Sequence, residues 1–418
     1  MGDFSKLGDS AVRVVDVAVA VAAAPLAFAG VYLGVLSAFA RAKPAPSSDL
    51  SVRFAIVVPA HNEALSIAET VKNLQTLRYP VGQLRILVVA DNCTDDTGAQ
   101  ARDAGAEVIE RTDRENRGKG FALACAFEVL LAEDVPVHAV VVVDADTRAS
   151  SNLLLAFSGR IASGAEAMQA SYRVANSRTT WRTALMGVAF ACMHDVRSLG
   201  RERLRLSTGL RGNGMCFTVG SLRRVPHDAT SLVEDVEHGI DLALQGVRVV
   251  FVHEAFVEAE MPERANSAAS QRERWERGRA QLRRERALPL LRSALRRRDR
   301  VQADLSVDLL LPPLSQYLIA LSAVGSFATL LTFARQRLAL SAVPVALGAV
   351  GLACHVGEGW RQSGTGVDGL RALSKVPEYV FWKAGLRTRR SPRKFALGPK
   401  GSNAEEWVRT TRNAEDSK

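Results

Sequence analysis

Three long apolar runs stand out in a chain that otherwise mixes polar and apolar residues. The first covers residues 14–40 and contains one charged residue, Asp16. It exceeds the roughly 20 residues that cross a bilayer as a helix, so it predicts an N-terminal membrane anchor. Two further runs, at 305–333 and 338–356, are separated only by a short basic link. Their spacing predicts a hairpin that crosses the membrane or lies at its interface.

Charged residues at the ends of these runs decide how each is interpreted. A signal peptide is the alternative for the first run, but Asp16 and the sparse positive charge ahead of it favour an uncleaved anchor. Arg41 and Lys43 follow this run directly and place that end in the cytoplasm. Asp308 and the neighbouring prolines make the start of the second run a poor lipid-facing helix. That part is therefore expected at the interface or against protein.

Between Val52 and about Val257, short β-branched runs alternate with amphipathic helical stretches. This alternation predicts an α/β fold with a mostly parallel sheet that helices cover on both faces. Helices are expected at 63–77 and 120–132. The expected strands lie at residues 54–58, 84–90, 107–109, 137–143, 167–172, 214–219 and 247–252.

The patterns divide the chain into five expected regions of a multi-pass protein of the cell inner (plasma) membrane. Arginines in the hairpin turn weaken the placement of that turn outside the cell, since positive charge favours the cytoplasm. The regions are an N-terminal anchor with its flanks at 1–43, a cytoplasmic α/β domain at 44–278, an arginine-rich interfacial segment at 279–304, a transmembrane or interfacial hairpin at 305–360 and a basic cytoplasmic tail at 361–418.

The net charge of +10 is unevenly distributed along the chain. Residues 272–300 are crowded with arginine next to apolar runs, which is typical of segments that bind anionic membrane lipids. A solvated helical face is the alternative. No recognition helix, aromatic stacking series or RNA-binding signature accompanies the arginines, so nucleic acid is not an expected partner. Five cysteines lie far apart without zinc-site spacing, which argues against a zinc site or a disulfide framework.

Acidic motifs follow two of the expected strands. Asp91 ends the strand at 84–90, and Asp144 and Asp146 follow the strand at 137–143. Ligands of open α/β sheets bind at the carboxyl ends of strands. Two carboxylates one residue apart can approach a common Mg²⁺ or Mn²⁺ ion, because these ions prefer oxygen ligands. Helix-capping aspartates in a surface turn are the alternative interpretation.

Later motifs add cations, glycines and further acids in a fixed order. Residues 116–120 place Arg117 and Lys119 beside two glycines near an expected helix start, an arrangement suited to phosphate oxygens although it is not a Walker A loop. Glycines flank an asparagine at 212–214. Two further motifs are Glu234-Asp235 and the run Gln271-Arg272-Glu273-Arg274-Trp275.

The ordered set resembles the motifs of the family 2 inverting glycosyltransferases, which have the GT-A fold. It is most similar to their membrane-attached branch, with the cellulose, hyaluronan and glycolipid synthases. The resemblance covers about residues 52–278 together with the flanking membrane segments. The combination is far more specific than any single motif. It rests on residues 59–63, 91–97, 144–146, 212–214, 234–235 and 271–275.

The resemblance implies a site with divided roles. Asp235 is implied as the general base that takes a proton from the acceptor hydroxyl, and Arg274 as a group that helps the diphosphate leave. Glu234, which stands beside this base, is expected to be catalytic as well. A divalent ion, Mg²⁺ or Mn²⁺, is expected at Asp144 and Asp146. The expected donor contacts are Pro59, Glu63, Asp91, Lys119 and Asp144. The expected acceptor contacts are Gly212, Asn213, Gln271 and Trp275.

The implied function is transfer of a hexose from a nucleotide sugar, a UDP-sugar first, to a lipid or glycan acceptor in envelope glycolipid or polysaccharide synthesis. Three expected spans are fewer than a polymer-conducting channel generally needs, which favours single transfers to lipid. Residues 90–93 read Ala-Asp-Asn-Cys where many family members carry Asp-Asp-Gly-Ser. Two alternatives stay open, a small processive polysaccharide synthase and a non-catalytic nucleotide-binding membrane regulator.

Overall fold

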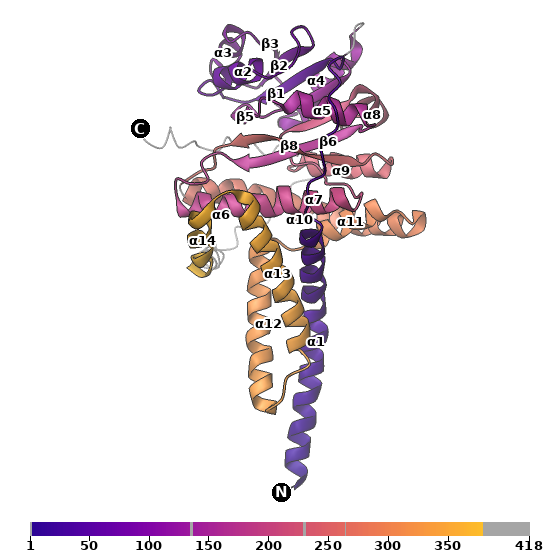
Figure 1. Ribbon diagram of the computed structural model, residues 1–418, viewed down its shortest axis with the longest axis vertical. Coiled ribbons are helices and arrows are strands. Elements are labelled where there is room, and N and C mark those ends of the chain that lie inside the picture. Colours follow the sequence, from indigo (N-terminus) through magenta and orange to yellow (C-terminus); the bar gives the residue numbers. More distant parts are fainter. Residues whose placement is uncertain (1, 134–136, 229–230, 264, 379–418) are drawn as a thin grey trace.

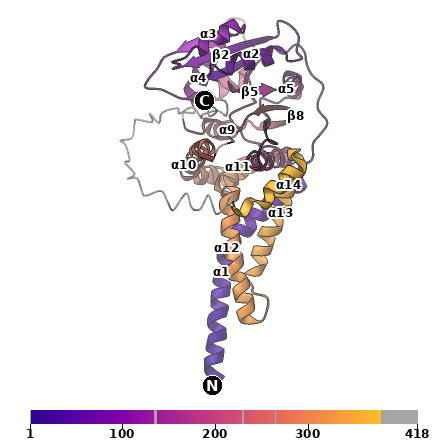
Figure 2. The ribbon, with the colours of Figure 1, turned by 90° about the vertical axis from the view of Figure 1, so that its left-hand side faces the viewer.

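The computed structural model describes residues 2–133, 137–228, 231–263 and 265–378, and within these ranges it describes the side chains of residues 10–263 and of residues 273 onward. Three tiers follow one another along the long axis (Figure 1): a sheet with its helices, a layer of helices that lie across that axis, and three long helices that project away. Seen from the side in Figure 2, the first long helix, α1 (Gly2–Ala38), extends beyond the turn that joins the other two.

The described part of the chain contains one sheet of eight strands, in the order β3-β2-β1-β4-β7-β6-β8-β5. Its strands are β1 (Phe54–Ala60), β2 (Leu84–Asp91), β3 (Glu107–Arg111), β4 (Ala139–Val142), β5 (Thr147–Ala149), β6 (Ala167–Val174), β7 (Met215–Thr218) and β8 (Val249–Ala259). The predicted α/β class and all seven expected strands are confirmed, and the short β5 was not predicted.

Strand direction differs between the two halves of the sheet. Strands β3, β2, β1 and β4 are parallel to one another, as predicted. Strand β7 is antiparallel to both β4 and β6, and β5 is antiparallel to β8, whereas β6 and β8 are parallel. The sheet is therefore mixed, because an apolar run reveals that a strand is buried but not which way it points.

Helices cover both faces of the sheet, which explains the continuous apolar runs of the central strands. Phe54, Ile56 and Val58 pack on one face, together with residues of α2 (Ile67–Gln75), α3 (Thr97–Asp103) and α5 (Leu153–Ala162). Ala55 and Val57 pack on the other face. The helices that cover this second face are α4 (Lys119–Ala132), α8 (Val219–Arg224) and α9 (Glu234–Leu244).

The middle tier is built from helices of widely separated parts of the chain. It contains α6 (Trp181–Phe190), the π-helical turn η1 (Ala191–Val196), α7 (Arg197–Arg203), α10 (Ala265–Arg297) and α11 (Arg300–Leu310). The hairpin expected at 305–360 is formed by α12 (Leu314–Arg335) and α13 (Ala342–Ser363), so its first residues belong to α11 instead. Helix α14 (Gly366–Ser374) follows, and the expected basic tail lies outside the described residues beyond position 378.

Two aspartates of α11 hold the middle tier together. Arg201 of α7 is fully buried and forms ion pairs of 2.8 Å with both Asp304 and Asp308. Arg279 of α10 pairs with Asp308 at 2.8 Å, and the Tyr32 hydroxyl of α1 donates to Asp304 at 2.7 Å. The carboxylates therefore join α1, α7, α10 and α11, and Asp308 lies against protein, one of the two positions expected for it.

Three helices of the described chain are long and apolar enough to cross a membrane: Ser10–Ala38 within α1, Leu314–Arg335 and Ala342–Ser363. Small residues bring α1 and α13 into close contact. A Cβ on Gly30 would lie 2.5 Å from the carbonyl oxygen of Gly348, so neither helix has room there for a larger residue. The Tyr317 hydroxyl of α12 donates to the carbonyl oxygens of Leu26, at 2.8 Å, and Gly348, at 3.1 Å.

Asp16, the one charged residue of the first apolar run, and Arg335, in the basic link between the other two runs, are partners. The guanidinium of Arg335, at the end of α12, pairs with the buried carboxylate of Asp16. Asp16 also accepts hydrogen bonds from the backbone of Leu340 at 2.8 Å and from the Ser341 hydroxyl at 2.7 Å. The anchor and the hairpin turn thus satisfy one another's polar groups, as burial away from water requires.

We expect Asp308→Ala to lower the free energy of unfolding by about 3–5 kcal/mol, because it leaves Arg201 and Arg279 without their shared buried carboxylate. Asp368→Ala is the matched control, since Asp368 forms an exposed pair with Arg371 at 3.7 Å and exposed pairs contribute little. Denaturant titration of both variants in detergent measures the difference. Equal, small effects would show that the buried network does not stabilise the middle tier.

Candidate active site

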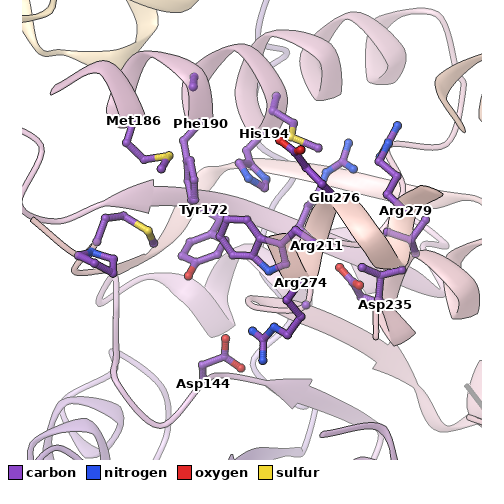
Figure 3. Close-up of a pocket in the computed structure, with 18 of the residues that line it drawn as sticks. Asp144, Tyr172, Met186, Phe190, His194, Arg211, Asp235, Arg274, Glu276 and Arg279 are labelled. Atoms are coloured by element: carbon purple, nitrogen blue, oxygen red, sulfur yellow. The ribbon is translucent and has the colours of Figure 1, made fainter. Parts of the chain in front are cut away.

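One cavity connects the sheet to the long helices. Its volume is about 1590 Å³. Toward the sheet it is lined by Pro59, Glu63 and Asp144, and toward the long helices by Leu311 and Pro313. Figure 3 shows that its side chains come from opposite walls, with Asp144 on the sheet side and Met186 and Phe190 on the helical side. A single space therefore reaches from the strand ends to the first residues of α12.

The motif after β4 contributes two carboxylates to the cavity, Asp144 and Asp146. The turn that carries them is held by Asn213, whose side chain is 1% exposed. Its amide oxygen accepts from the backbone N–H of Asp144 at 3.1 Å, and its amide nitrogen donates to the Thr147 hydroxyl at 2.8 Å. Asn213 was expected to contact the acceptor, and its side chain braces this turn in the structure.

Lys119, the first residue of α4, lies where the acidic groups converge. Its ammonium group pairs with Asp144 and donates to the Gly212 carbonyl oxygen at 2.6 Å. Burial lowers the pKa of Lys119, but the negative charges of Asp144, Glu234 and Asp235 outweigh that effect and raise it. The lysine therefore stays protonated and links the carboxylates after β4 to those that begin α9.

Glu234 and Asp235 occupy the first turn of α9 and both line the cavity. Burial, and then the neighbouring charge of Asp235, raise the pKa of Glu234 to about 7. Burial also raises the pKa of Asp235. Gly212 lies against this pair with φ of +79°, and a Cβ there would lie 3.5 Å from Asp235 Oδ2. With its pKa raised to about 7, Glu234 is poised to exchange a proton near neutral pH.

The tryptophan motif lies on α10. Trp275 packs near Phe190, with 6.4 Å between the ring centroids. Arg274 points toward Asp144 in Figure 3, and its buried Nε has no hydrogen-bond acceptor among the residues described. Gln271 belongs to the same helix, but its side chain is not among those described. The motif thus places a cation and an aromatic face in the cavity.

Asp91 lies behind the cavity wall and is fully buried. Its Oδ1 pairs with Arg111 at 2.7 Å. Its Oδ2 is buried and accepts no hydrogen bond from the described residues. A buried acceptor without a donor is costly, and a purely structural role for Asp91 does not explain that cost.

Several cavity residues were missed by sequence reasoning. Tyr172 ends in the cavity from β6, His194 lies on η1, and Arg211 and Arg279 approach from the loop before β7 and from α10. Arg211 directly precedes the glycine motif at 212–214, and this position was the available signal. No sequence signal marked Tyr172, His194 or Arg279 as cavity residues, because the elements that carry them meet only in three dimensions.

The donor atoms fit a divalent ion that shares its coordination with a ligand. Asp144 and Asp146 offer hard carboxylate oxygens in the cavity. In the described part of the chain no group of three or more His, Cys, Asp or Glu residues could hold a metal by itself. An ion here would take its remaining oxygens from a bound diphosphate or from water, as Mg²⁺ sites commonly do.

We expect Asn213→Ala to lower the free energy of unfolding by about 1–3 kcal/mol, because it leaves the Asp144 N–H and the Thr147 hydroxyl without partners. Asn116→Ala serves as the control, since the exposed Asn116 side chain bonds only to Asp113 at 3.0 Å. Thermal unfolding in detergent compares the two. An unchanged melting temperature for Asn213→Ala would contradict the bracing role.

Comparison with known proteins supports one family. The family model described as "Glycosyltransferase like family 2" matches residues 52–278, the same span on which the motifs lie. A probable glycosyltransferase, YdaM of Bacillus subtilis, is 27% identical over 237 residues, which cover 54% of this chain and 55% of the relative. A beta-monoglucosyldiacylglycerol synthase of Nostoc is 33% identical over 105 residues, which cover 24% of this chain and 21% of the relative. The chain thus spans about half or less of the curated relatives it matches.

The fold also has a counterpart among solved structures. A mannosyltransferase from Pyrobaculum calidifontis, solved with GDP-Man and Mn²⁺, matches 80% of this chain and 97% of its own, with a TM-score of 0.51 and 18% sequence identity. At this identity the likeness concerns the fold alone. Together these findings confirm the GT-A fold and the resemblance to family 2 glycosyltransferases. The site residues were predicted from that resemblance.

Proposed function

This chain belongs to the glycosyltransferase-like family 2 and is a transferase, and from that premise we propose that it moves a hexose from a nucleotide sugar to a membrane lipid with inversion at the anomeric carbon. The observation that carries the proposal is the cavity that reaches from Asp144 to Leu314 and Leu318 of α12. A donor at one end and a lipid at the other would meet beside Asp235. A glycolipid synthase among the relatives supports the same acceptor class.

Donor binding is assigned to the strand-end side of the cavity. The free Oδ2 of Asp91 would accept the imide N–H of a uracil, which favours a UDP-sugar as the first donor to test. Pro59 and Glu63 line the adjoining wall. The diphosphate would lie between Asp144 and Arg274, where Lys119 can exchange its contact with Asp144 for a phosphate oxygen.

The reaction proposed is a direct displacement. Asp235 takes the proton from the acceptor hydroxyl as its oxygen bonds to the anomeric carbon, while the bond from that carbon to the diphosphate oxygen breaks. Arg274 and Lys119 supply positive charge to the departing diphosphate. A Mg²⁺ or Mn²⁺ ion held by Asp144 and Asp146 would neutralise part of that charge when bound. Trp275 would offer its ring to the acceptor, and Gly212 leaves space beside the base.

The proposal is tested by nucleotide release from the purified protein across UDP- and GDP-sugars, with Mn²⁺ or Mg²⁺, in the presence and absence of membrane lipids. We expect one donor to give release that requires lipid, and chelation of the metal by EDTA to suppress it. Donor turnover that yields long glycans without lipid would point to a processive synthase. The product's partition into organic solvent gives a second readout.

We expect kcat/KM to rise with pH through an apparent pKa near 7, because Asp235 accepts a proton only when ionised and shares a buried pair with Glu234, whose pKa is raised to about 7. Glu234→Gln should shift the rise of kcat/KM to lower pH. The substitution removes one of two neighbouring negative charges, so Asp235 ionises more easily. Asp235→Asn should bind the donor normally but lose transfer. Near-normal turnover by Asp235→Asn would remove that residue from the base role.

A further inference from the structure

The membrane end of the cavity holds more arginine than the proposed reaction uses. Arg197, Arg211 and Arg279 all line the cavity on the side of α11 and the long helices. Arg201 lies directly behind them and is fully buried. The proposed displacement requires only Arg274 and Lys119. Asp304 and Asp308 pair with Arg197, Arg201 and Arg279. Arg211 is the guanidinium that needs its own explanation, because burying positive charge without an anion is costly.

Three of these four arginines share two aspartates at this end. Arg201 pairs with Asp304 and Asp308, and Asp308 also receives Arg279 at 2.8 Å and Arg197 at 3.4 Å. Arg211 forms no carboxylate pair with the residues described. Its guanidinium donates to the Thr208 carbonyl oxygen at 3.1 Å, and its buried Nε has no acceptor there.

Neighbouring titratable groups respond to this surplus positive charge. Burial lowers the pKa of Arg211 to about 10, and Arg201, Arg279 and Arg197 add to that effect against the opposing charge of Asp308. Burial, together with the charges of Arg211 and Arg197, likewise holds the pKa of His194 well below its ordinary value. The charge of Arg211 also lowers the pKa of Asp235, although burial raises that pKa more. Glu276 lines the cavity as well. An anion would be stabilised between Asp235 and α11.

An apolar groove continues from the same end of the cavity. It lies between α12 and α13 and has a volume of about 360 Å³. Leu318, Leu352 and Val356 line both the groove and the cavity, so the two spaces adjoin. The groove exists because Ser322, Ala349 and Ala353 are small. Its width and apolar lining suit a hydrocarbon chain.

We propose that the acceptor is an acidic lipid whose headgroup carries both an anionic phosphate and a free hydroxyl. Arg211, supported by Arg197 and Arg279, binds the phosphate. The hydrocarbon chain lies in the groove between α12 and α13, and this geometry presents the hydroxyl to Asp235. The inference rests on the proposed function for the transfer itself, but the lipid site can be measured by binding alone.

The headgroup is tested with short-chain phosphatidylglycerol and phosphatidylcholine of equal chain length. We expect the wild type to bind and glycosylate the former, and Arg211→Gln to weaken its binding and raise its KM roughly 10- to 100-fold while the donor KM stays within about twofold. Arg211→Lys should recover part of the affinity, because it restores the charge without the planar fork. Arg102→Gln, an exposed arginine on α3, should change nothing.

Three results would overturn the headgroup assignment. Equal KM values for the acidic and the neutral lipid would show that the headgroup charge is not recognised. A rise in donor KM with Arg211→Gln would assign the arginine to the diphosphate. If Arg211→Gln bound the acidic lipid as tightly as the wild type, Arg197, Arg211 and Arg279 would have a structural role only. Binding that depends on Arg211 without sugar transfer would instead contradict the proposed function and leave the lipid site standing.

The chain groove is tested by filling it. We expect Ala353→Phe to raise the KM of long-chain acceptors at least about tenfold and to leave a two- or four-carbon analogue unaffected, because only the long chain reaches the groove. Val350→Phe is the matched control on the exposed face of the same helix, where the side chain is 63% exposed. Equal effects of the two variants, or equal effects on short and long chains, would contradict the groove as the chain site.

Discussion

The buried carboxylate of Asp308 forms ion pairs with three arginines on two different helices. The position of the cavity depends on these ion pairs. Arg201 and Arg197 approach from α7 and Arg279 from α10. Asp304, one turn earlier on α11, adds Tyr32 of α1 to the network. These contacts fix α10, and hence Arg274 and Trp275, relative to the long helices. The same network leaves Arg211 without a carboxylate of its own.

Charge in the cavity is arranged in two zones of opposite sign around Asp235. Toward the sheet, Asp144, Glu234 and Asp235 converge on one ammonium group, that of Lys119. Toward the long helices, positive charge is in surplus. A metal–diphosphate complex would relieve the first zone, and an anionic headgroup would relieve the second. The base at the boundary would then meet both substrates, which is how proximity contributes to such a transfer.

The sequence predicts the chemistry better than the geometry. Strand runs and short motifs located Asp144, Asp146, Glu234 and Asp235 in one cavity, because strand ends and motif order constrain them. The motif did not reveal that the side chain of Asn213 braces the turn after β4, because a motif does not show which backbone groups a polar side chain bonds to. Arg211 and Tyr172 were missed because they come together only when α7, α10 and the antiparallel β7 pack. Asp16 and Arg335 looked anomalous separately, and their pairing appears only in three dimensions.

The most direct test of one cavity shared by a nucleotide sugar and a membrane lipid is photocrosslinking in lipid nanodiscs. A lipid with a photoreactive group near the chain terminus would be activated with the full-length protein, and labelled residues mapped by mass spectrometry. We expect labelling of Leu318, Leu352 and Val356, and we expect an unlabelled acceptor lipid to compete with that labelling. Labelling confined to outward residues such as Leu330 and Val350, without competition, would contradict it.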